Sequence, residues 1–266
     1  MNLPAPAFIT GGSSGIGLEL AKQLAARGHP IAIFARDAGR LQDAVRVIKA
    51  ASPDAFVTAY PCNVADRLAT ESAVAAAIAD HGAPGWAIAN AGIAEPGEFL
   101  SQAIESFEEQ MNVNYLGALY FARAAAPAMT AQGGRLVFVA SGAAFFGIYG
   151  YSAYAPSKFA LRGLAEVLRV ELAAHRISVT LAYPPDTDTP QLRAEAATKP
   201  AVTRAITAGG GVWQPFDVAA LIVRRAEKGR FTAAPGFQMK ALLMLHSLLA
   251  PALRLWQAGL VRKHRR

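Results

Sequence analysis

The octapeptide "TGGSSGIG", residues 10–17, connects a short apolar run at 7–10 to the helical pattern "LELAKQLAARG" at 18–28. Its glycines permit a tight turn and close packing of a new helix against the preceding strand. A buried strand, a glycine-rich turn and a helix in this order are typical of the first unit of a parallel α/β sheet. This stretch therefore predicts the class of fold.

The remainder of the chain continues the same alternation. Its strand-like runs are uniformly apolar, as expected for strands buried on both faces, and strands joined through helices form right-handed crossovers. We predict an α/β fold with a Rossmann-type doubly wound parallel sheet and helices on both faces. The predicted strands are 7–10, 31–35, 55–60, 86–90, 135–140, 177–183 and 231–235, and the predicted helices are 15–27, 38–51, 67–81, 100–131, 152–174 and 215–228.

Two regions depart from this rhythm. Residues 184–212 begin with prolines and end with "AGGG". Long irregular insertions in compact folds often cover a substrate. Residues 237–266 are unusually apolar and end in a basic tail. We predict one domain over 1–236, with a substrate loop at 184–212, followed by an apolar helical segment at 237–266.

The composition argues against several classes of protein. With 53% hydrophobic and 17% charged residues, the chain is not predicted to be disordered. Its net charge of +7 is scattered except in the tail at 262–266, with no aromatic-interleaved basic stripe, so we predict no nucleic-acid partner. Cys62 is the single cysteine, which allows no intrachain disulfide. The N-terminus lacks the pattern of a secretory signal, so we expect the catalytic part in the cytosol or facing it.

The glycine-rich turn is suited to a dinucleotide cofactor. It lies at a predicted helix N-terminus, where N–H donors and a favourable dipole attract a diphosphate. The predicted cofactor contacts on this turn are Gly11, Ser13, Ser14, Gly15, Ile16 and Gly17.

The end of the second predicted strand indicates which dinucleotide is bound. Sites for NAD place a carboxylate there, whereas this chain has Ala35 followed by Arg36, with Arg40 four residues on. Without a carboxylate the 2′-hydroxyl of NAD lacks its usual partner, whereas a guanidinium is a partner for a 2′-phosphate. We predict NADPH; the alternative is that both arginines are ordinary surface charges.

Three residues form a candidate catalytic set. "YAPSK" places Tyr154 and Lys158 four apart on one helical face. A nearby ammonium stabilises a phenolate, so we expect Lys158 to lower the pKa of Tyr154. Ser141 ends the strand-like run "RLVFVAS", at the sheet edge where ligands bind. We predict that Ser141 donates to a carbonyl oxygen while Tyr154 delivers the proton.

In series these motifs resemble the short-chain dehydrogenase/reductase family. "TGGSSGIG", "NAG" at 90–92, "NVNYLG" at 112–117, Ser141 and "YAPSK" follow the family's order over residues 5–190. The resemblance implies that Asn114 belongs to the catalytic set, holding a water that links Lys158 to solvent, and that the chain forms a homodimer or homotetramer. It also implies cofactor contacts by Asn63, Val64, Asn90 and Thr189, in addition to Tyr154 and Lys158.

Two positions depart from the family's pattern. Asn63 stands where the family often has an aspartate that binds the adenine amino group, and its amide oxygen still accepts such a bond. Pro185 stands where the family usually has glycine, which stiffens the loop before Thr189.

One branch of the family, the NADPH-dependent reductases of long-chain 3-keto sphingoid bases, is more similar still. The stretches "YPPDTDTP" at 183–190, "FAR" at 34–36, "VNYLG" at 113–117 and "FALRGLAE" at 159–166 carry this resemblance. It implies a lipid substrate with an ammonium beside its ketone. We expect Asp186 or Asp188 to bind that ammonium; alternatively, the aspartates cap the following helix or keep the loop solvated. No histidine or further carboxylate accompanies them, so we predict no metal site.

The segment at 237–266 fits a lipid substrate. Its run "ALLMLHSLLAPAL" at 241–253 is shorter than the ~20 residues that span a bilayer. Pro251 and Arg254 favour an interfacial helix, and Trp256 and the basic tail suit the lipid interface. We expect the protein at the cytoplasmic face of a membrane. The alternative is that this segment packs against the protein's own core or a second subunit.

Two other functions fit the same motifs. The first is an NADPH-dependent reductase of another hydrophobic ketone, such as a steroid, a retinoid or an acyl-chain carbonyl. The second is a catalytically silent NADP(H)-binding scaffold. The intact Ser141, Tyr154 and Lys158 argue against the second.

Overall fold

The computed structural model describes residues 4–264 and is built around one seven-stranded sheet. The strand order is β3-β2-β1-β4-β5-β6-β7, and the neighbouring strands run parallel. The predicted strands are confirmed, with bounds that differ by at most a few residues. They are β1 (Ala7–Thr10), β2 (Ile31–Ala35), β3 (Val57–Pro61), β4 (Trp86–Ala89), β5 (Gly134–Val139), β6 (Ile177–Ala182) and β7 (Thr232–Ala233).

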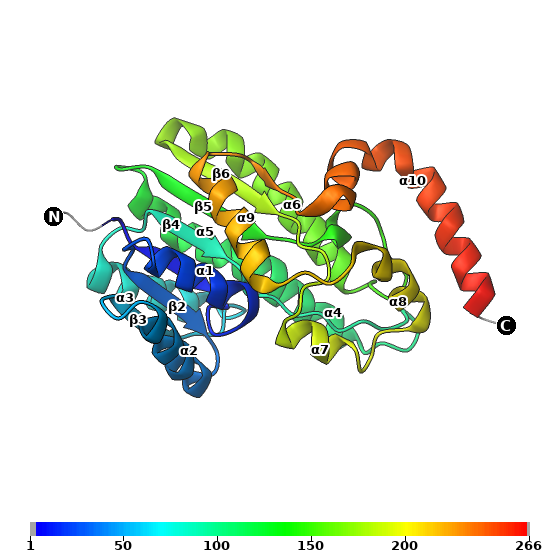
Figure 1. Cartoon of the computed structure of the whole chain (residues 1–266), viewed down its shortest axis with the longest axis horizontal. Coiled ribbons are helices and arrows are strands. Elements are labelled where there is room, and N and C mark those ends of the chain that lie inside the picture. Colours follow the sequence, from blue (N-terminus) through cyan, green and yellow to red (C-terminus); the bar gives the residue numbers. More distant parts are fainter. Residues whose placement is uncertain (1–3, 265–266) are drawn as a thin grey trace.

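Helices cover both faces of the sheet, as the uniformly apolar strands require (Figure 1). On one face lie α1 (Gly15–Ala25), α2 (Ala38–Ala51) and α9 (Pro215–Glu227), and on the other α3 (Arg67–His81), α5 (Gly117–Met129) and α6 (Tyr154–Glu171). Alternate strand residues face the two layers: Phe8 packs with the α3/α5/α6 layer, and Ile9 packs with the α1/α2/α9 layer. The doubly wound Rossmann-type fold is confirmed.

The long helical pattern predicted at 100–131 is interrupted. It consists of α4 (Ile104–Met111), a π-helical turn η1 (Asn112–Leu116) and α5. Single π-helical turns are frequent at functional sites because they redirect a side chain without ending the helix. Asn114 lies in this turn, buried beneath α6.

The predicted substrate loop contains two short helices, α7 (Pro190–Glu195) and α8 (Ala201–Thr207). Thr189 caps α7, with its hydroxyl oxygen accepting from the Leu192 amide at 3.2 Å, and Pro190 occupies the first helical position. The cap is therefore a threonine and neither of the two preceding aspartates. Short 3₁₀ turns occur at η2 (Gly142–Ala144), η3 (Leu172–His175) and η4 (Ala208–Gly210).

The last helix, α10 (Gly236–His264), runs from the sheet edge out along one end of the molecule (Figure 1). Met239 and Leu242 in its first turns are buried, whereas later apolar residues such as Leu248 and Trp256 are exposed. Among residues 4–264, none of the helices combines the length and the apolarity that crossing a bilayer requires. The last two residues of the predicted basic tail, Arg265 and Arg266, lie outside the described residues.

Candidate active site

A cavity of about 540 Å³ opens at the carboxyl ends of the central strands, beside the point where the strand order reverses between β1 and β4. Ligands of open parallel sheets bind at this position. The predicted site residues that line it are Gly11, Ser13, Ser14, Gly15, Ile16, Arg36, Arg40, Asn63, Val64, Asn90, Ser141, Tyr154, Lys158, Asp186 and Thr189. The predicted site residues Gly17, Asn114 and Asp188 are not among its lining residues.

The glycine turn forms a backbone cradle at one end of this cavity. Gly11 and Gly15 adopt φ values of 64° and 53°, which side chains other than glycine rarely tolerate. A Cβ on Gly17 would lie 2.2 Å from the Gly11 carbonyl oxygen. The start of α1 therefore packs so closely against the turn that only glycine fits at this position. Asn90 locks the turn by donating from Nδ2 to the Thr10 oxygen at 3.0 Å and to the Gly11 oxygen at 3.2 Å. This cradle fits a diphosphate.

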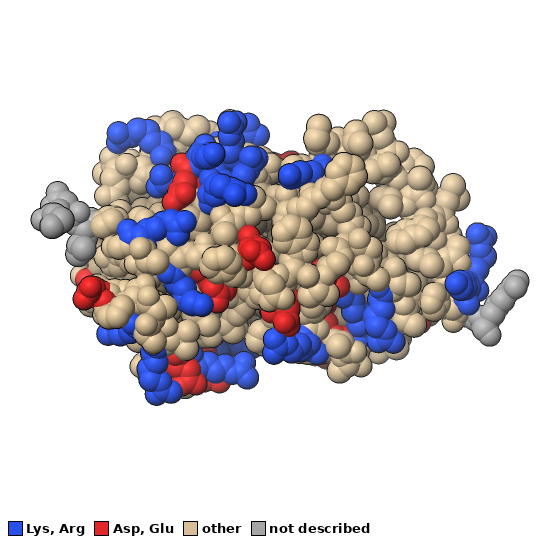
Figure 2. Space-filling view, viewed as in Figure 1, with Lys and Arg blue, Asp and Glu red and all other residues tan. Residues whose placement is uncertain are grey.

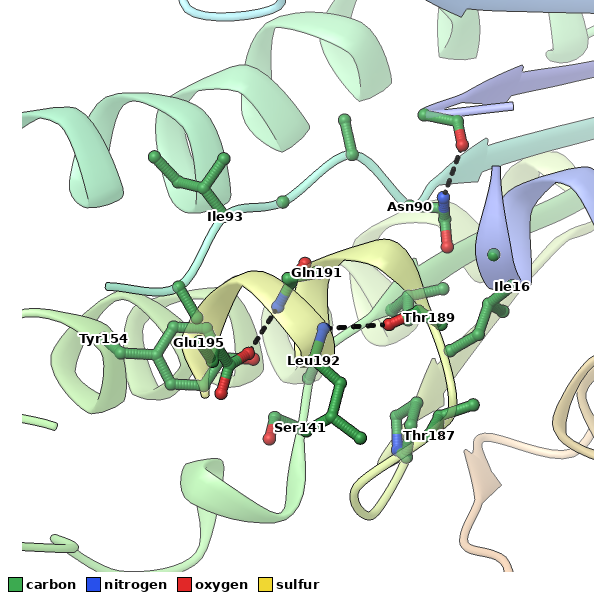
Figure 3. Close-up of a pocket in the computed structure, with 18 of the residues that line it drawn as sticks. Ile16, Asn90, Ile93, Ser141, Tyr154, Thr187, Thr189, Gln191, Leu192 and Glu195 are labelled. Atoms are coloured by element: carbon green, nitrogen blue, oxygen red, sulfur yellow. Dashed lines mark hydrogen bonds between the residues drawn. The ribbon is translucent and has the colours of Figure 1, made fainter. Parts of the chain in front are cut away.

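The loop after β6 lies over the glycine turn. A Cβ on Gly15 would meet the Thr189 methyl carbon at 2.9 Å, so Thr189 contacts the turn directly. The structure thus brings Thr189 to the cofactor end of α7, between the cradle and Ser141 (Figure 3). We propose that it binds the nicotinamide carboxamide.

At the opposite end of the cradle, cationic side chains are available to a phosphate. Arg36 pairs with Glu109 at 3.8 Å and Arg40 with Asp37 at 3.6 Å, and all four side chains are more than half exposed. The Asp37 carboxylate also caps α2 by accepting from the Arg40 amide at 3.0 Å. Exposed ion pairs contribute little free energy, so a 2′-phosphate competes for both guanidinium groups at small cost.

Asn63 lies beside these arginines, in the turn that follows β3. Its Oδ1 accepts from the Ala65 amide at 3.2 Å, which holds the side chain in a turn conformation. The side chain remains exposed and lines the cavity together with Val64. An amide oxygen has a second lone pair, so a contact to an adenine amino group remains open.

The candidate catalytic side chains meet where β5 ends and α6 begins. Tyr154 is the first residue of α6, and Lys158 Nζ lies 5.5 Å from the centre of its ring. Lys158 donates to the Val139 carbonyl oxygen at 3.2 Å. Ser141 follows the end of β5 by two residues and starts η2, where its hydroxyl oxygen accepts from the Ala143 amide at 3.2 Å. Ser141 also lies within hydrogen-bonding reach of the Tyr154 phenol.

The electrostatics of this cluster correct one prediction. The pKa of Tyr154 is raised, because burial and, next, the negative charge of Glu195 outweigh the hydrogen bonds from Ser141 and Gln191 that lower it. The sequence predicts that Lys158 lowers the pKa of Tyr154, whereas the net shift of that pKa is upward. The pKa of Lys158 is lowered to about 8 by burial, against which Glu195 acts to raise it. Tyr154 carries its proton at neutral pH, as a tyrosine at its ordinary pKa also does, and the upward shift makes it a weaker acid.

Asn114 positions the neighbouring elements. Its Oδ1 accepts from the Ile93 amide at 2.8 Å, and its Nδ2 donates to the Ile93 oxygen at 2.9 Å and to Ser157 Oγ at 3.0 Å. These bonds tie η1 to the segment after β4 and to the first turn of α6. Both polar atoms of the side chain are therefore engaged by protein, and the side chain sets the place of Lys158 through α6.

The two predicted ammonium-binding aspartates are directed apart. Asp188 lies outside the cavity lining, 43% exposed, and accepts from Arg193 at 2.9 Å. Asp186 lines the cavity, and its carboxylate pairs with the buried Lys199 at 3.2 Å. Asp188 N donates to the Trp213 oxygen and Trp213 N donates to the Asp186 oxygen, both at 2.9 Å, so the backbone of both aspartates is held against Trp213. The two side chains differ in their ion-pair partners, Arg193 for Asp188 and Lys199 for Asp186.

Sequence reasoning missed one buried acidic residue of the cavity, Glu195 on α7. It is 6% exposed, and its Oε2 accepts from the Tyr151 hydroxyl at 3.0 Å. Its Oε1 accepts from Gln191 Nε2 at 3.1 Å (Figure 3). The only signal in the sequence was its place within the predicted substrate loop.

Comparison with known proteins places these features in a family. The family model described as "short chain dehydrogenase" matches residues 5–200. A "3-dehydrosphinganine reductase" of Danio rerio is 40% identical over 245 residues, covering 90% of this chain and 74% of the relative. A "3-ketodihydrosphingosine reductase" of Dictyostelium discoideum is 36% identical over 260 residues, covering 91% and 78%. A metagenomic short-chain oxidoreductase, solved in complex with NADP, is 26% identical, with a TM-score of 0.69 over 84% of this chain and 90% of that one.

Proposed function

Because the chain belongs to the short-chain dehydrogenase family, we propose that it is an NADPH-dependent reductase that converts 3-dehydrosphinganine (3-ketodihydrosphingosine) to sphinganine. The observation that carries this proposal is that Ser141, Tyr154 and Lys158 line the same cavity as a group of apolar side chains. The chain is also 36–40% identical to relatives named for that reaction.

The proposed cofactor fits the cradle. The solved relative with NADP supports a nicotinamide dinucleotide in this fold. The glycine turn would hold the diphosphate, Arg36 and Arg40 the 2′-phosphate, and Thr189 the carboxamide. Selectivity for NADPH over NADH is supported by Arg36 and Arg40 in the cavity lining and by the absence of a carboxylate at Ala35 and Arg36.

The reaction follows from the positions of the protein's own groups. Bound NADPH supplies the hydride for the ketone carbon. Ser141 donates a hydrogen bond to the ketone oxygen and holds it beside Tyr154. Tyr154, which is protonated at neutral pH, gives its proton to that oxygen as negative charge develops. Lys158 stabilises the phenolate that remains, because its ammonium lies one helical turn away over the ring.

The far end of the cavity suits an alkyl chain. It is lined by Phe146, Ile148, Ile206, Met239 and Leu242, which come from the segment between η2 and α6, from α8 and from α10. Beyond them the surface of α10 is mostly uncharged, with Arg254 exposed along it and basic side chains near its C-terminal end (Figure 2). We propose that α10 rests on the cytoplasmic face of a membrane and that the lipid enters the cavity beside Met239 and Leu242.

The test is NADPH oxidation by the purified protein with 3-ketodihydrosphingosine, with NADH as the cofactor control. We expect turnover with NADPH, and weaker turnover with NADH. Equal or faster turnover of a steroid, a retinoid or an acyl-chain ketone would assign the chain to a different substrate.

A further inference from the structure

Glu195 is a buried carboxylate at the substrate end of the cavity that the reaction described above does not use. It lines the cavity together with Tyr151, Tyr154 and Gln191. Its two oxygens accept neutral hydrogen bonds, from the Tyr151 hydroxyl at 3.0 Å and from Gln191 Nε2 at 3.1 Å. Neutral donors orient a carboxylate without adding a positive charge beside it.

Two ammonium groups of the described residues interact with this carboxylate: Lys158, whose pKa it acts to raise, and Lys199, which is shared with Asp186. Lys199 Nζ lies 3.9 Å from Glu195 Oε2 and 3.2 Å from Asp186 Oδ2. Asp186 is therefore the closer partner, and two carboxylates face one ammonium. Burial raises the pKa of Glu195, as expected when a buried carboxylate lacks a full counter-charge. Because Lys199 lies closer to Asp186, part of the Glu195 charge remains available to a cation that enters the cavity.

Glu195 is also close to the proton donor. Its charge is the largest electrostatic cause of the raised pKa of Tyr154, second only to burial. In Figure 3, its carboxylate lies beside the Tyr154 ring, on the same side of α7 as Gln191. In 3-ketodihydrosphingosine the amine is bonded to the carbon next to the ketone. A ketone held by Tyr154 therefore carries its ammonium to the immediate neighbourhood of that phenol.

We propose that Glu195 binds the substrate's ammonium group, and so selects amino ketones, while Tyr154 protonates the adjacent ketone oxygen. This assignment rests on the proposed function and replaces Asp188 as the ammonium contact. Tyr151 and Gln191 hold the carboxylate in place, and Asp186 keeps Lys199 from neutralising it. The bound ammonium offsets the charge that raises the pKa of Tyr154, so the correct substrate also makes its own proton donor more acidic.

The experiment compares kcat/KM for 3-ketodihydrosphingosine and for its desamino analogue in wild-type protein and in Glu195→Gln. We expect the variant to lose about 10- to 100-fold on the amino ketone, as for loss of a charged hydrogen bond, and to change less than about 3-fold on the desamino ketone. Equal losses on both ketones, or no loss on the amino ketone, overturn the assignment.

Two further variants sharpen the comparison. Glu71→Gln makes the same chemical change at an exposed position of α3, where Glu71 pairs with Arg67. It should leave kcat/KM unchanged for both ketones. Asp188→Asn tests the earlier hypothesis. A selective loss on the amino ketone in Asp188→Asn but not in Glu195→Gln refutes the role of Glu195. If wild-type protein reduces the desamino ketone as well as the amino ketone, the proposed substrate class fails before either variant is considered.

A measurement on wild-type protein guards against a variant that does not fold. Decylammonium and decanol have the same chain length and differ in charge. We expect decylammonium to compete with the amino ketone and to inhibit at an at least ~10-fold lower concentration than decanol. Equal inhibition by the two would show that the cavity has no cation site, and the assignment would fall.

Discussion

Lys158 Nζ lies 5.5 Å from the centre of the Tyr154 ring and donates to the Val139 carbonyl oxygen at 3.2 Å, in a place where both side chains are buried. A buried ammonium with one neutral acceptor costs folding free energy. The protein keeps this cost because the ammonium faces the phenolate that forms when Tyr154 gives up its proton. Function and stability are therefore opposed at Lys158.

Replacing this lysine should separate the two effects. In Lys158→Met, we expect the free energy of unfolding to rise by about 1–3 kcal/mol, because the desolvated charge is removed from a well-packed site. We expect kcat for ketone reduction to fall by at least ~100-fold. Urea unfolding and steady-state kinetics on the same preparations measure both. A variant that is less stable than wild type would contradict this account.

The same lysine predicts a dependence of stability on pH. Its pKa is about 8 in the folded protein, below the ordinary value of 10.5 that it has when unfolded. Between these values the unfolded chain binds more protons, so the contribution of Lys158 to the free energy of unfolding rises with pH. The advantage of Lys158→Met over wild type should be largest below pH 8 and should shrink as the pH approaches 10.5. A constant difference across this interval would show that the charge of Lys158 is not the cause.

The cradle should be intolerant of one methyl group. In Gly17→Ala, the new Cβ would meet the Gly11 oxygen at 2.2 Å, so the turn must move. We expect the dissociation constant for NADPH to rise more than ~10-fold, measured by quenching of tryptophan fluorescence. Gly163→Ala on α6 is the matched control, because nothing lies within 4 Å of its Cβ. That control should bind NADPH normally and be equally or slightly more stable.

The two arginines at the adenosine end should set cofactor choice. Removing Arg36 and Arg40 together should raise KM for NADPH by about 10- to 100-fold, because each guanidinium forms charged hydrogen bonds to a phosphate. KM for NADH, which lacks that phosphate, should stay within about 3-fold. Arg67→Ala, at an exposed position of α3, is the control for loss of positive charge away from the cavity. Equal increases in KM for NADPH and in KM for NADH would mean that the arginines act on the fold rather than on the 2′-phosphate.

The exposed apolar side of α10 should govern membrane binding. Leu248 and Leu255 are 79% and 76% exposed, so charged residues there leave the packed core untouched. Leu248→Glu with Leu255→Glu should reduce co-sedimentation with vesicles that contain anionic lipid by more than half. Val170→Glu on α6, which is 74% exposed, provides the control. Unchanged co-sedimentation of the double variant would remove the membrane role of α10.

The features that the sequence predicted depend on local patterns. β1 and the glycine turn could be predicted because uniform apolarity and glycine spacing are local. Tyr154 and Lys158 could be predicted to share a helical face from their spacing alone. The fold followed from repetition of the same unit.

Other features depend on packing between distant segments. Glu195 becomes a buried acid only because α7 packs against Tyr151, which lies 44 residues away in the sequence. The raised pKa of Tyr154 arises from that same packing, so the spacing of Tyr154 and Lys158 predicted the opposite sign. Asp188 pairs with Arg193 and Asp186 pairs with Lys199, and no pattern within "YPPDTDTP" indicates these partners, which lie outside that stretch.

The most direct test of the proposed reaction is the formation of sphinganine from 3-ketodihydrosphingosine and NADPH, measured by mass spectrometry for wild-type protein and Tyr154→Phe. Phenylalanine keeps the ring and removes only the proton donor. We predict sphinganine from wild type, and at least ~100-fold less from Tyr154→Phe with NADPH binding retained. No sphinganine from wild type, or equal amounts from both proteins, would contradict the account.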